Sequence, residues 1–210
     1  AALDWTPDPA LLAQLANESD SGLKIVTEQW FRAANQIGTL GGGNHFIELQ
    51  VEDSRFGVEG IDNAGDGRLW IMIHSGSRNV GKQVCDHYHQ VAVAYMERFH
   101  SQVSDTNLAF LPEGVPEYDA YLDEMHWCMA FAEESRRTML ESVITVILDA
   151  LGIQLQAHLI VDTHHNFVAQ ENHYSGNLWI HRKGAVKAEG LVTIPGSMGT
   201  ASYVCLGLQT

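Results

Sequence analysis

The sequence has 210 residues, a length that suffices for one sizeable domain with its own hydrophobic core. Apolar residues make up 45% and charged residues 18%, which is an ordinary globular composition. No apolar run reaches the roughly 18 residues of a membrane span, and residues 1–9 lack the features of a signal peptide. The net charge of −14 argues against non-specific binding of nucleic acid over the whole surface, but leaves room for a local basic site.

The three cysteines, Cys85, Cys128 and Cys205, are widely spaced and form no Cys-x-x-Cys pair. This pattern predicts reduced, buried thiols in a cytoplasmic protein, and it argues against a zinc ribbon or a redox motif. An alternative, in which Cys85 and His89 bind a metal together from one helix, stays open.

The predicted elements combine long helices with separated strands, which indicates an α+β fold. Helical spacing covers residues 10–35 (in two pieces), 80–99 and 118–151, and Gly152 is the expected C-terminal cap of the last helix. Strands are expected at residues 46–51, 69–73, 155–161, 177–181 and 190–194. Residues 53–67 are expected to form a hairpin or loop, and residues 101–116 a polar loop.

Polar loops rich in Gly, His or Asn adjoin five of these predicted strands. They comprise residues 41–45, 74–78, 162–166, 181–184 and 195–199. Rigid strands commonly deliver such loops to one place, so we expect the five loops to converge at an active site.

Three histidines, His45, His74 and His165, lie at strand boundaries inside these loops. Imidazole binds transition metals, and ligands far apart in sequence are typical of catalytic metal sites, so the three are candidate ligands. His164 and His165 are adjacent and face opposite sides of an extended chain, so they are not both expected to bind the same ion, and one of them is expected to orient the site. The pattern does not decide between two roles for His181, which are a contact with phosphate and a position in the core.

Glycines and basic residues in the same loops suit phosphate. Residues 41–43 are three glycines whose uncovered backbone amides would admit a phosphate or nucleotide, although tight turns would also explain them. Arg78 lies where a helix is predicted to begin and would add a bidentate phosphate contact. Further basic residues recur nearby: Lys82, Arg182, Lys183 and Lys187.

Taken together, five motifs resemble those of the RtcB family of RNA ligases, in the family's order and over most of the chain from Gly38 onward. They are Gly-Thr-Leu-Gly-Gly-Gly-Asn-His-Phe-Ile-Glu at 38–48, His-Ser-Gly-Ser-Arg at 74–78, His-Asn at 165–166, His-Arg-Lys-Gly-Ala at 181–185, and Pro-Gly-Ser-Met-Gly-Thr-Ala-Ser at 195–202.

The resemblance implies a mixed-sheet fold with long helices and active-site loops at strand ends. It also implies a ligase that uses GTP and two Mn²⁺ ions to join an RNA 3′-phosphate or 2′,3′-cyclic phosphate end to a 5′-hydroxyl end, in tRNA splicing or RNA repair. The implied substrates are tRNA halves or other broken RNA.

Residue by residue, the resemblance assigns His45 to one metal ion and both His74 and His165 to the other. Arg78 would contact RNA phosphate. The residues implied to hold the guanylate are Asn44, His45, Phe46, Ile47, Glu48, His165, Asn166, Pro195, Gly196, Ser197, Met198 and Ser202.

Two family segments have no match in residues 1–210: an early Asp-x-Gly-Cys that supplies metal ligands, and a late His-Gly-Ala-Gly-Arg whose histidine accepts the guanylate. We therefore expect the chain to be the central part of a single catalytic domain, with the guanylated histidine beyond Thr210 and no activity of its own.

Three alternatives remain open. A lysine-dependent ligase would need Lys-x-Asp-Gly, and Lys183-Gly184 lacks the Asp and the spacing. A family relative could use the site in RNA damage response or translation. A third alternative is an inactive module that binds metal or nucleotide.

Overall fold

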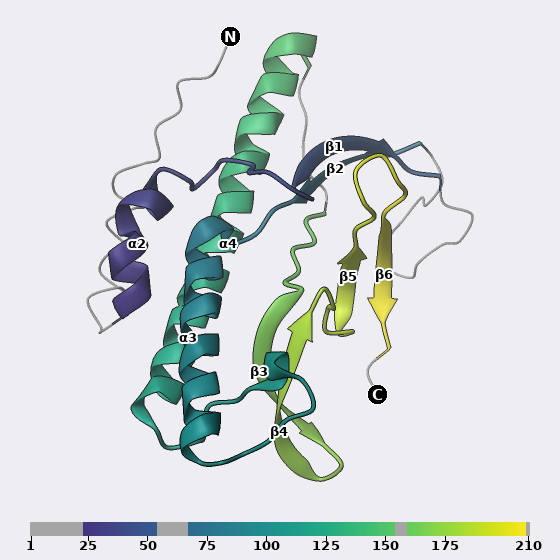
Figure 1. Cartoon of the computed structure of the whole chain (residues 1–210). Helices are drawn as coiled ribbons and strands as arrows, with labels where there is room; N and C mark the ends of the chain where they lie inside the picture. The colour runs from purple at the N-terminus through teal and green to yellow at the C-terminus, as the bar shows by residue number, and fades with distance from the viewer. Residues whose placement is uncertain (1–22, 54–66, 154–158, 209–210) are drawn as a thin grey trace. The chain divides into compact units, whose positions relative to one another are not determined.

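The computed structural model describes residues 23–53, 67–153 and 159–208, which form two compact units (Figure 1). The helical unit contains the described residues up to Thr39 together with 76–138, and the hairpin unit contains those of 40–75 and 139–208. The assignment of the chain to a single catalytic domain stays a prediction.

Three helices supply the helical unit: α2 (Lys24–Ala34), α3 (Arg78–Arg98) and the first part of α4 (Pro116–Leu151). A short 3₁₀ helix, η1 (Thr106–Leu108), lies in the predicted polar loop. The predictions for α3 and α4 are confirmed to within two residues. Gly152 is also confirmed as the cap, because it has a φ of 62° and its N–H bonds to the Leu148 carbonyl at 2.9 Å.

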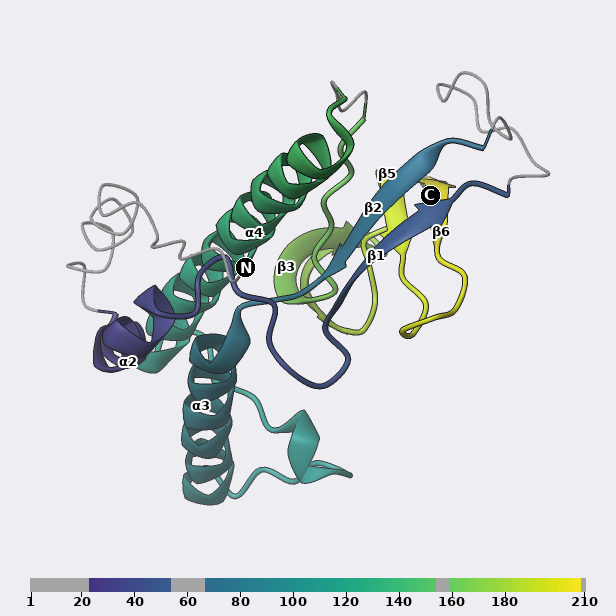
Figure 2. The same ribbon diagram turned by 90° about the horizontal axis from the view of Figure 1, so that it is seen from above.

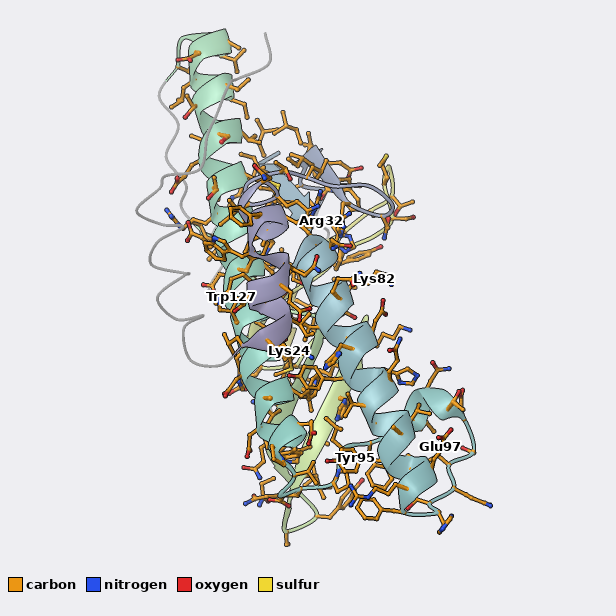
Figure 3. All side chains as sticks on the ribbon, turned by 60° about the vertical axis from the view of Figure 1, so that its left-hand side comes forward. Lys24, Arg32, Lys82, Tyr95, Glu97 and Trp127 are labelled. Carbon is orange, nitrogen blue, oxygen red and sulfur yellow. The ribbon has the colours of Figure 1, made fainter. Side chains whose placement is uncertain are left out.

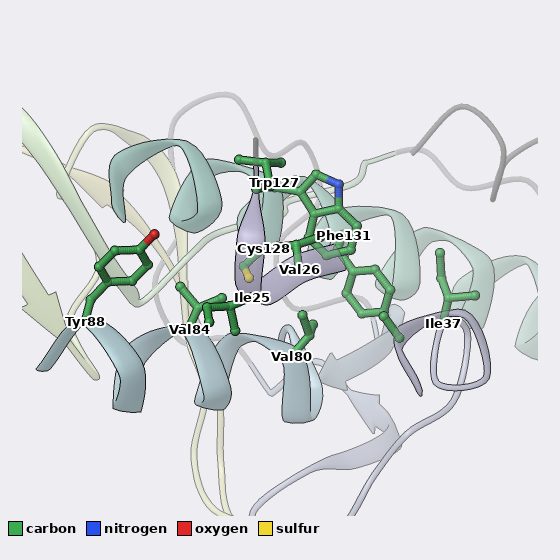
Figure 4. Packing of buried hydrophobic residues seen from close by; sticks show 11 residues of the cluster. Ile25, Val26, Ile37, Val80, Val84, Tyr88, Trp127, Cys128 and Phe131 are labelled. Carbon is green, nitrogen blue, oxygen red and sulfur yellow. The ribbon is translucent and has the colours of Figure 1, made fainter. Parts of the chain in front are cut away.

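The core of the helical unit is one continuous cluster of buried side chains (Figure 4). Val80, Val84 and Tyr88 recur at four-residue intervals on α3, so they share one face. They pack with Trp127 and Phe131 of α4, whose rings stack at 5.4 Å. The remaining members are Leu23, Ile25, Val26, Ala33, Ile37 and Cys128.

Two buried side chains of α4 fasten α2 and the turn that follows it. Glu124 Oε1 accepts a hydrogen bond from Ile25 N at 2.8 Å, in the first turn of α2, and Ser135 Oγ accepts one from Gly38 N at 3.0 Å. The N-cap residue Leu23 has no side-chain oxygen, so Glu124 takes over the capping role from a distant position in the sequence. Burial of Glu124 raises the pKa of its carboxyl above the usual value.

The outer faces of these helices are charged, as Figure 3 shows for Lys24 and Arg32 on α2 and for Lys82 and Glu97 on α3. All four side chains are exposed. This placement agrees with the amphipathic spacing that predicted the helices.

The thiols differ in their surroundings. Cys128 is buried, and burial raises its pKa to about 12, so its thiol is neutral at physiological pH. Cys205 is partly buried, whereas Cys85 is exposed, which makes the prediction of a buried thiol wrong for Cys85. All three are free.

The hairpin unit contains three separate two-stranded antiparallel sheets (Figures 1 and 2). They are β1 (Phe46–Val51) with β2 (Leu69–His74), β3 (Asn166–His173) with β4 (Gly176–Lys183), and β5 (Gly190–Ile194) with β6 (Tyr203–Gly207). The α+β class agrees with this structure. The mixed sheet does not appear among the described residues, because each strand there pairs only with its neighbour along the chain, and that pairing is antiparallel.

Three strands differ from the sequence predictions. The strand expected at 155–161 lies partly outside the described residues. Its described part, residues 159–161, is not part of any strand. Instead, β3 begins at Asn166, beyond the polar loop. It returns as β4 through Tyr174 and Ser175, which have φ values of 53° and 63°. A two-residue turn of this kind usually contains Gly or Asn, so the sequence did not signal it. Strand β6 was not predicted either.

Within the described ranges, none of the helices combines the length and the apolarity needed to cross a membrane.

Candidate functional site

The three candidate histidines converge in the hairpin unit. His45 directly precedes β1, His74 ends β2, and His165 directly precedes β3. The Nε2 atoms of His74 and His165 are 3.1 Å apart. The ring centroids of His45 and His74 are 6.3 Å apart. The expected convergence is therefore found in the structure, whereas a metal-binding role for these residues stays a prediction.

Strand pairing explains why two of these rings meet. The register places Phe46 opposite His74, so the residue before β1 and the last residue of β2 lie at the same end of the hairpin. Phe46 is buried, and its ring contacts the His74 ring edge-on at a centroid distance of 5.2 Å. Phe46 therefore supports the His74 ring from the side.

A cavity of about 590 Å³ opens beside the histidines, within the usual size range of small-ligand sites. Its wall comes from all three hairpins. The lining residues are Asn44, His45, His74, His165, Gly184, Ala185, Val186, Thr193, Ile194 and Pro195.

The segment after β4 is bound to the start of β3 by two hydrogen bonds. Asn166 Oδ1 accepts from Gly184 N at 2.9 Å, and the His165 carbonyl accepts from Ala185 N at 3.1 Å. The other end of the Asn166 amide, Nδ2, lies 2.7 Å from His165 Nδ1. This network fixes part of the cavity wall against the His165 ring.

The loop at 195–202 is held in a tight conformation next to β1. Gly196 N donates to Ser202 Oγ at 3.1 Å, and a Cβ on Gly196 would lie 2.4 Å from the Ala201 carbonyl oxygen. Only glycine fits at that position without a shift of the backbone. Glu48 Oε1 accepts from Gly199 N at 2.7 Å, which fastens this loop to β1.

The sequence as a whole matches a known family. The model of the family described as tRNA-splicing ligase RtcB matches residues 13–210. This chain belongs to the RtcB family. The similarity covers all five motif loops and both units.

Similar RtcB proteins occur in bacteria and archaea. The RNA-splicing ligase RtcB of Escherichia coli (strain K12) is 31% identical over 97% of this chain and 50% of its own length. The RNA-splicing ligase RtcB of Mycobacterium tuberculosis (strain ATCC 25618 / H37Rv) is 37% identical over 88% of this chain and 47% of its own length. The tRNA-splicing ligase RtcB of Methanopyrus kandleri is 33% identical over 85% of this chain and 22% of its own length. The chain therefore spans about half the length of the first curated relatives it matches.

The RtcB-motif residues implied to hold nucleotide are only partly brought together. Asn44, His45, His165 and Pro195 line the cavity. The other eight do not line it: Phe46, Ile47, Glu48, Asn166, Gly196, Ser197, Met198 and Ser202. Among these, Ile47 points to the face of the β1–β2 hairpin opposite Phe46, since successive residues of a strand alternate between faces.

Arg78, the RtcB-motif residue expected to contact RNA phosphate, belongs to the helical unit. It has a left-handed backbone, with a φ of 58°, which is unusual for a residue with a side chain. Its Nη1 donates to the Thr39 carbonyl at 3.3 Å, and burial lowers its pKa from the usual value.

The predicted basic residues of the hairpin unit are mostly paired. Arg182 donates two hydrogen bonds to Glu171, one of them 3.0 Å long, and stacks over the Phe167 ring. Lys187 pairs with Glu189. His181 lies within β4, and its side chain is exposed rather than in a core.

Three lining residues, Val186, Thr193 and Ile194, were not recognised from the sequence. Thr193 and Ile194 end β5, directly before the motif that begins at Pro195. Their position next to this motif was the only feature of the sequence that could have identified them as lining residues. Thr193 Oγ1 also shares a hydrogen bond of 2.7 Å with Thr163 Oγ1, which ties β5 to the loop before His165.

Proposed function

We propose that this chain forms part of the active site of an RNA ligase that joins RNA 3′-phosphate or 2′,3′-cyclic phosphate ends to 5′-hydroxyl ends with GTP and two Mn²⁺ ions. Family membership supports the proposal, as do the names of the relatives, which are RNA-splicing or tRNA-splicing ligases. The observation that carries it is the pair of imidazole nitrogens, His74 Nε2 and His165 Nε2, 3.1 Å apart at the edge of the cavity.

The His74–His165 pair fits a metal ion as two of its ligands. The two Nε2 atoms lie close enough together that both imidazoles would serve as ligands of a single divalent transition-metal ion. His45, which the resemblance assigns to a second ion, lines the same cavity. Among the residues that the structure describes, no group of three or more His, Cys, Asp or Glu side chains is arranged to hold a metal ion. The alternative of a metal bound by Cys85 and His89 stays a prediction. Further ligands would have to come from other residues.

The chemistry also favours a metal at this position. A bound divalent ion would neutralise phosphate charge and orient the RNA ends for in-line displacement. The chain contributes the two imidazoles as ligands, and the cavity wall from Gly184 to Val186 limits where a nucleotide can lie. Glu48 keeps the Pro195–Ser202 loop in place through Gly199, so its carboxylate acts on the loop rather than from within the cavity.

Manganese binding by the 210-residue chain tests the ligand assignment. We expect His74→Ala and His165→Ala each to weaken Mn²⁺ affinity at least about tenfold in calorimetry, since each removes a direct ligand. His126→Ala is the matched control, because His126 is exposed on α4 in the helical unit. Equal Mn²⁺ affinity in all three variants and the unchanged chain would remove the metal assignment.

Ligation is tested on the complete gene product, because the chain spans about half of its first relatives. RNA with a 3′-phosphate and RNA with a 5′-hydroxyl are incubated with GTP and Mn²⁺. We expect a joined product that disappears in His74→Ala and persists in His126→Ala. Binding of metal without any joined product would favour a non-ligating relative or a metal-binding module.

A further inference from the structure

The loop of residues 195–202, which joins β5 to β6, is held to β1 by two neighbouring side chains of that strand. Glu48 Oε1 accepts a hydrogen bond from Gly199 N at 2.7 Å. Gln50 Nε2 lies 3.4 Å from Ser202 Oγ. Glu48 and Gln50 are two residues apart, so they lie on the same face of the β1–β2 hairpin. The loop is therefore anchored at two points along one strand.

Gln50 connects these two anchors to each other. Its Nε2 also donates to Glu48 Oε2 at 2.9 Å, so one NH₂ group faces both the carboxylate and the Ser202 hydroxyl. An NH₂ group has two hydrogens to donate, one for each of these oxygens. Ser202 Oγ in turn accepts from Gly196 N at 3.1 Å. A continuous chain of hydrogen bonds thus links two amides of the loop, Gly199 N–H and Gly196 N–H, through Gln50.

The conformation of this loop matters for the cavity, because its first residue, Pro195, lines the cavity wall. The two ends of the loop touch, since a Cβ on Gly196 would lie 2.4 Å from the Ala201 carbonyl oxygen. A Cβ on Gly199 would meet nothing within 4 Å, so packing does not hold this part of the loop. Its bond to Glu48 ties it to β1 instead, and the orientation of the Glu48 carboxylate therefore determines where it lies.

We propose that Gln50 is a positioning residue, which orients the Glu48 carboxylate and the Ser202 hydroxyl and so fixes the loop in the conformation that binds a nucleotide. The link to nucleotide binding rests on the proposed function, in which the motif at 195–202 contributes to the guanylate site. Gln50 is not a lining residue of the cavity, so it acts through the loop rather than on the ligand. It also lies outside the five RtcB motifs, and the resemblance assigns it no role.

Amide hydrogen exchange, measured by NMR on the 210-residue chain, tests the positioning of the loop. Gln50→Glu keeps the size of the side chain, but it removes the NH₂ donor and places a second carboxylate beside Glu48. We expect exchange at Gly196 and Gly199 to become roughly tenfold faster, because a hydrogen bond to a charged group is lost. Gln170→Glu is the matched control, since Gln170 is exposed on β3 and the change in charge is the same. It should leave both exchange rates unchanged.

Exchanging the two side chains provides a rescue. In the double variant Glu48→Gln, Gln50→Glu, the amide at position 48 can accept from Gly199 N and donate to the carboxylate at position 50. That carboxylate can accept from the Ser202 hydroxyl, which still accepts from Gly196 N. The double variant should therefore restore slow exchange at both glycines. Fast exchange at Gly199 in the unchanged chain, slow exchange in Gln50→Glu, or a double variant that exchanges as fast as Gln50→Glu would each overturn the proposal.

Steady-state ligation by the complete gene product tests the link to nucleotide binding. Gln50→Glu should raise the KM for GTP roughly tenfold and leave kcat within about twofold, as the loss of a binding interaction does. A defect in folding alone would lower the amount of active enzyme, and with it kcat, while KM stayed the same. That result would overturn the link. If the unchanged gene product joined no RNA, the proposed function and the link would fail together, whereas hydrogen exchange would still decide whether Gln50 positions the loop.

Discussion

The helical unit holds the continuous apolar core of this chain, whereas the hairpin unit holds the candidate site. In the helical unit, eleven buried residues form one continuous cluster. In the described hairpin unit, the buried apolar residues are Phe46, Met139, Val168 and Val192, spread over separate elements. The three candidate histidines, His45, His74 and His165, and the cavity that they line belong to the hairpin unit. A site can be built where little apolar surface is buried, provided that hydrogen bonds hold its loops.

The β1–β2 hairpin shows the difference clearly. Its register places six aliphatic residues on one face: Ile47, Leu49, Val51, Leu69, Ile71 and Ile73. Leu49 is 60% exposed, and Val51 and Leu69 are each 65% exposed. A two-stranded sheet with such a face is at best marginally stable in water. We therefore expect the hairpin unit to respond less to core substitutions and more to charge and ligand than the helical unit does.

The largest effect is expected from Phe131→Ala, which empties the centre of the helical core. Phe131 is 1% exposed, and truncation of a buried phenylalanine costs about 3–5 kcal/mol of unfolding free energy. Urea denaturation followed by circular dichroism measures it. Phe31→Ala is the control, because Phe31 is 85% exposed on the same unit and its loss should change stability by less than about 0.5 kcal/mol. Similar losses in the two variants would contradict the assignment of the core.

The contrast between the units also explains what could be predicted from the sequence. Val80, Val84 and Tyr88 repeat at helical spacing, so α3 was predictable from its own residues. Strand β3 was not, since Asn166–His173 contains few apolar residues and its pairing depends on a turn of Tyr174 and Ser175. The turn lacks the Gly or Asn that usually signals a two-residue hairpin, so the local pattern did not predict this pair of strands.

The site was predictable in its residue types but not in its connections. His45, His74 and His165 stood out because each lies at a strand boundary within a family motif. The bridge from Gly184 through Asn166 to His165 was not predictable, because it depends on the β3–β4 register that places Asn166 opposite Lys183. Likewise, Arg182 looked available for phosphate in the sequence, yet it is engaged by Glu171.

A smaller effect is expected from Glu124→Ala, which removes the distant cap of α2. Ile25 N would lose its acceptor inside the protein, and an unsatisfied buried donor costs about 1–3 kcal/mol. Amide hydrogen exchange in α2 should show faster opening. Glu124→Gln is the control, because its amide oxygen can still accept from Ile25 N. Unaltered exchange in Glu124→Ala would mean that the cap is not needed.

The pH dependence of the same residue follows from its pKa, which burial raises above the ordinary value of 4.5. The folded protein then binds the proton more tightly than the unfolded chain does. Its contribution to stability is fully present below pH 4.5 and is lost as the pH rises through the raised pKa. Glu124→Gln should remove this part of the pH dependence, as denaturation between pH 4 and 7 would measure.

The smallest effect, and the opposite pH dependence, is expected for Glu171 in the hairpin unit. Hydrogen bonds from Arg182 hold the pKa of Glu171 at about 2, below its ordinary value of 4.5. Here the unfolded chain binds the proton more tightly, so the stabilisation is present above pH 4.5 and is lost as the pH falls through about 2. In Glu171→Gln the ion pair is gone at every pH, and we expect a loss of about 1 kcal/mol, the upper end for ion pairs that touch solvent.

Hydrogen exchange resolved by residue separates this effect from that of Glu124. On acidification from pH 4.5 towards 2, after correction for the intrinsic exchange rate, protection should fall in β3 and β4 while it persists in α3. Glu171→Gln should show low protection in β3 and β4 already at pH 4.5, with no further acid-induced loss from this pair. Lys82→Gln is the control, since it breaks the exposed pair with Asp86 in the helical unit and should leave β3 protected. A parallel loss of protection in α3 and β3 on acidification would mean that the two units unfold as one, and the division between a stabilising unit and a chemical one would then be wrong.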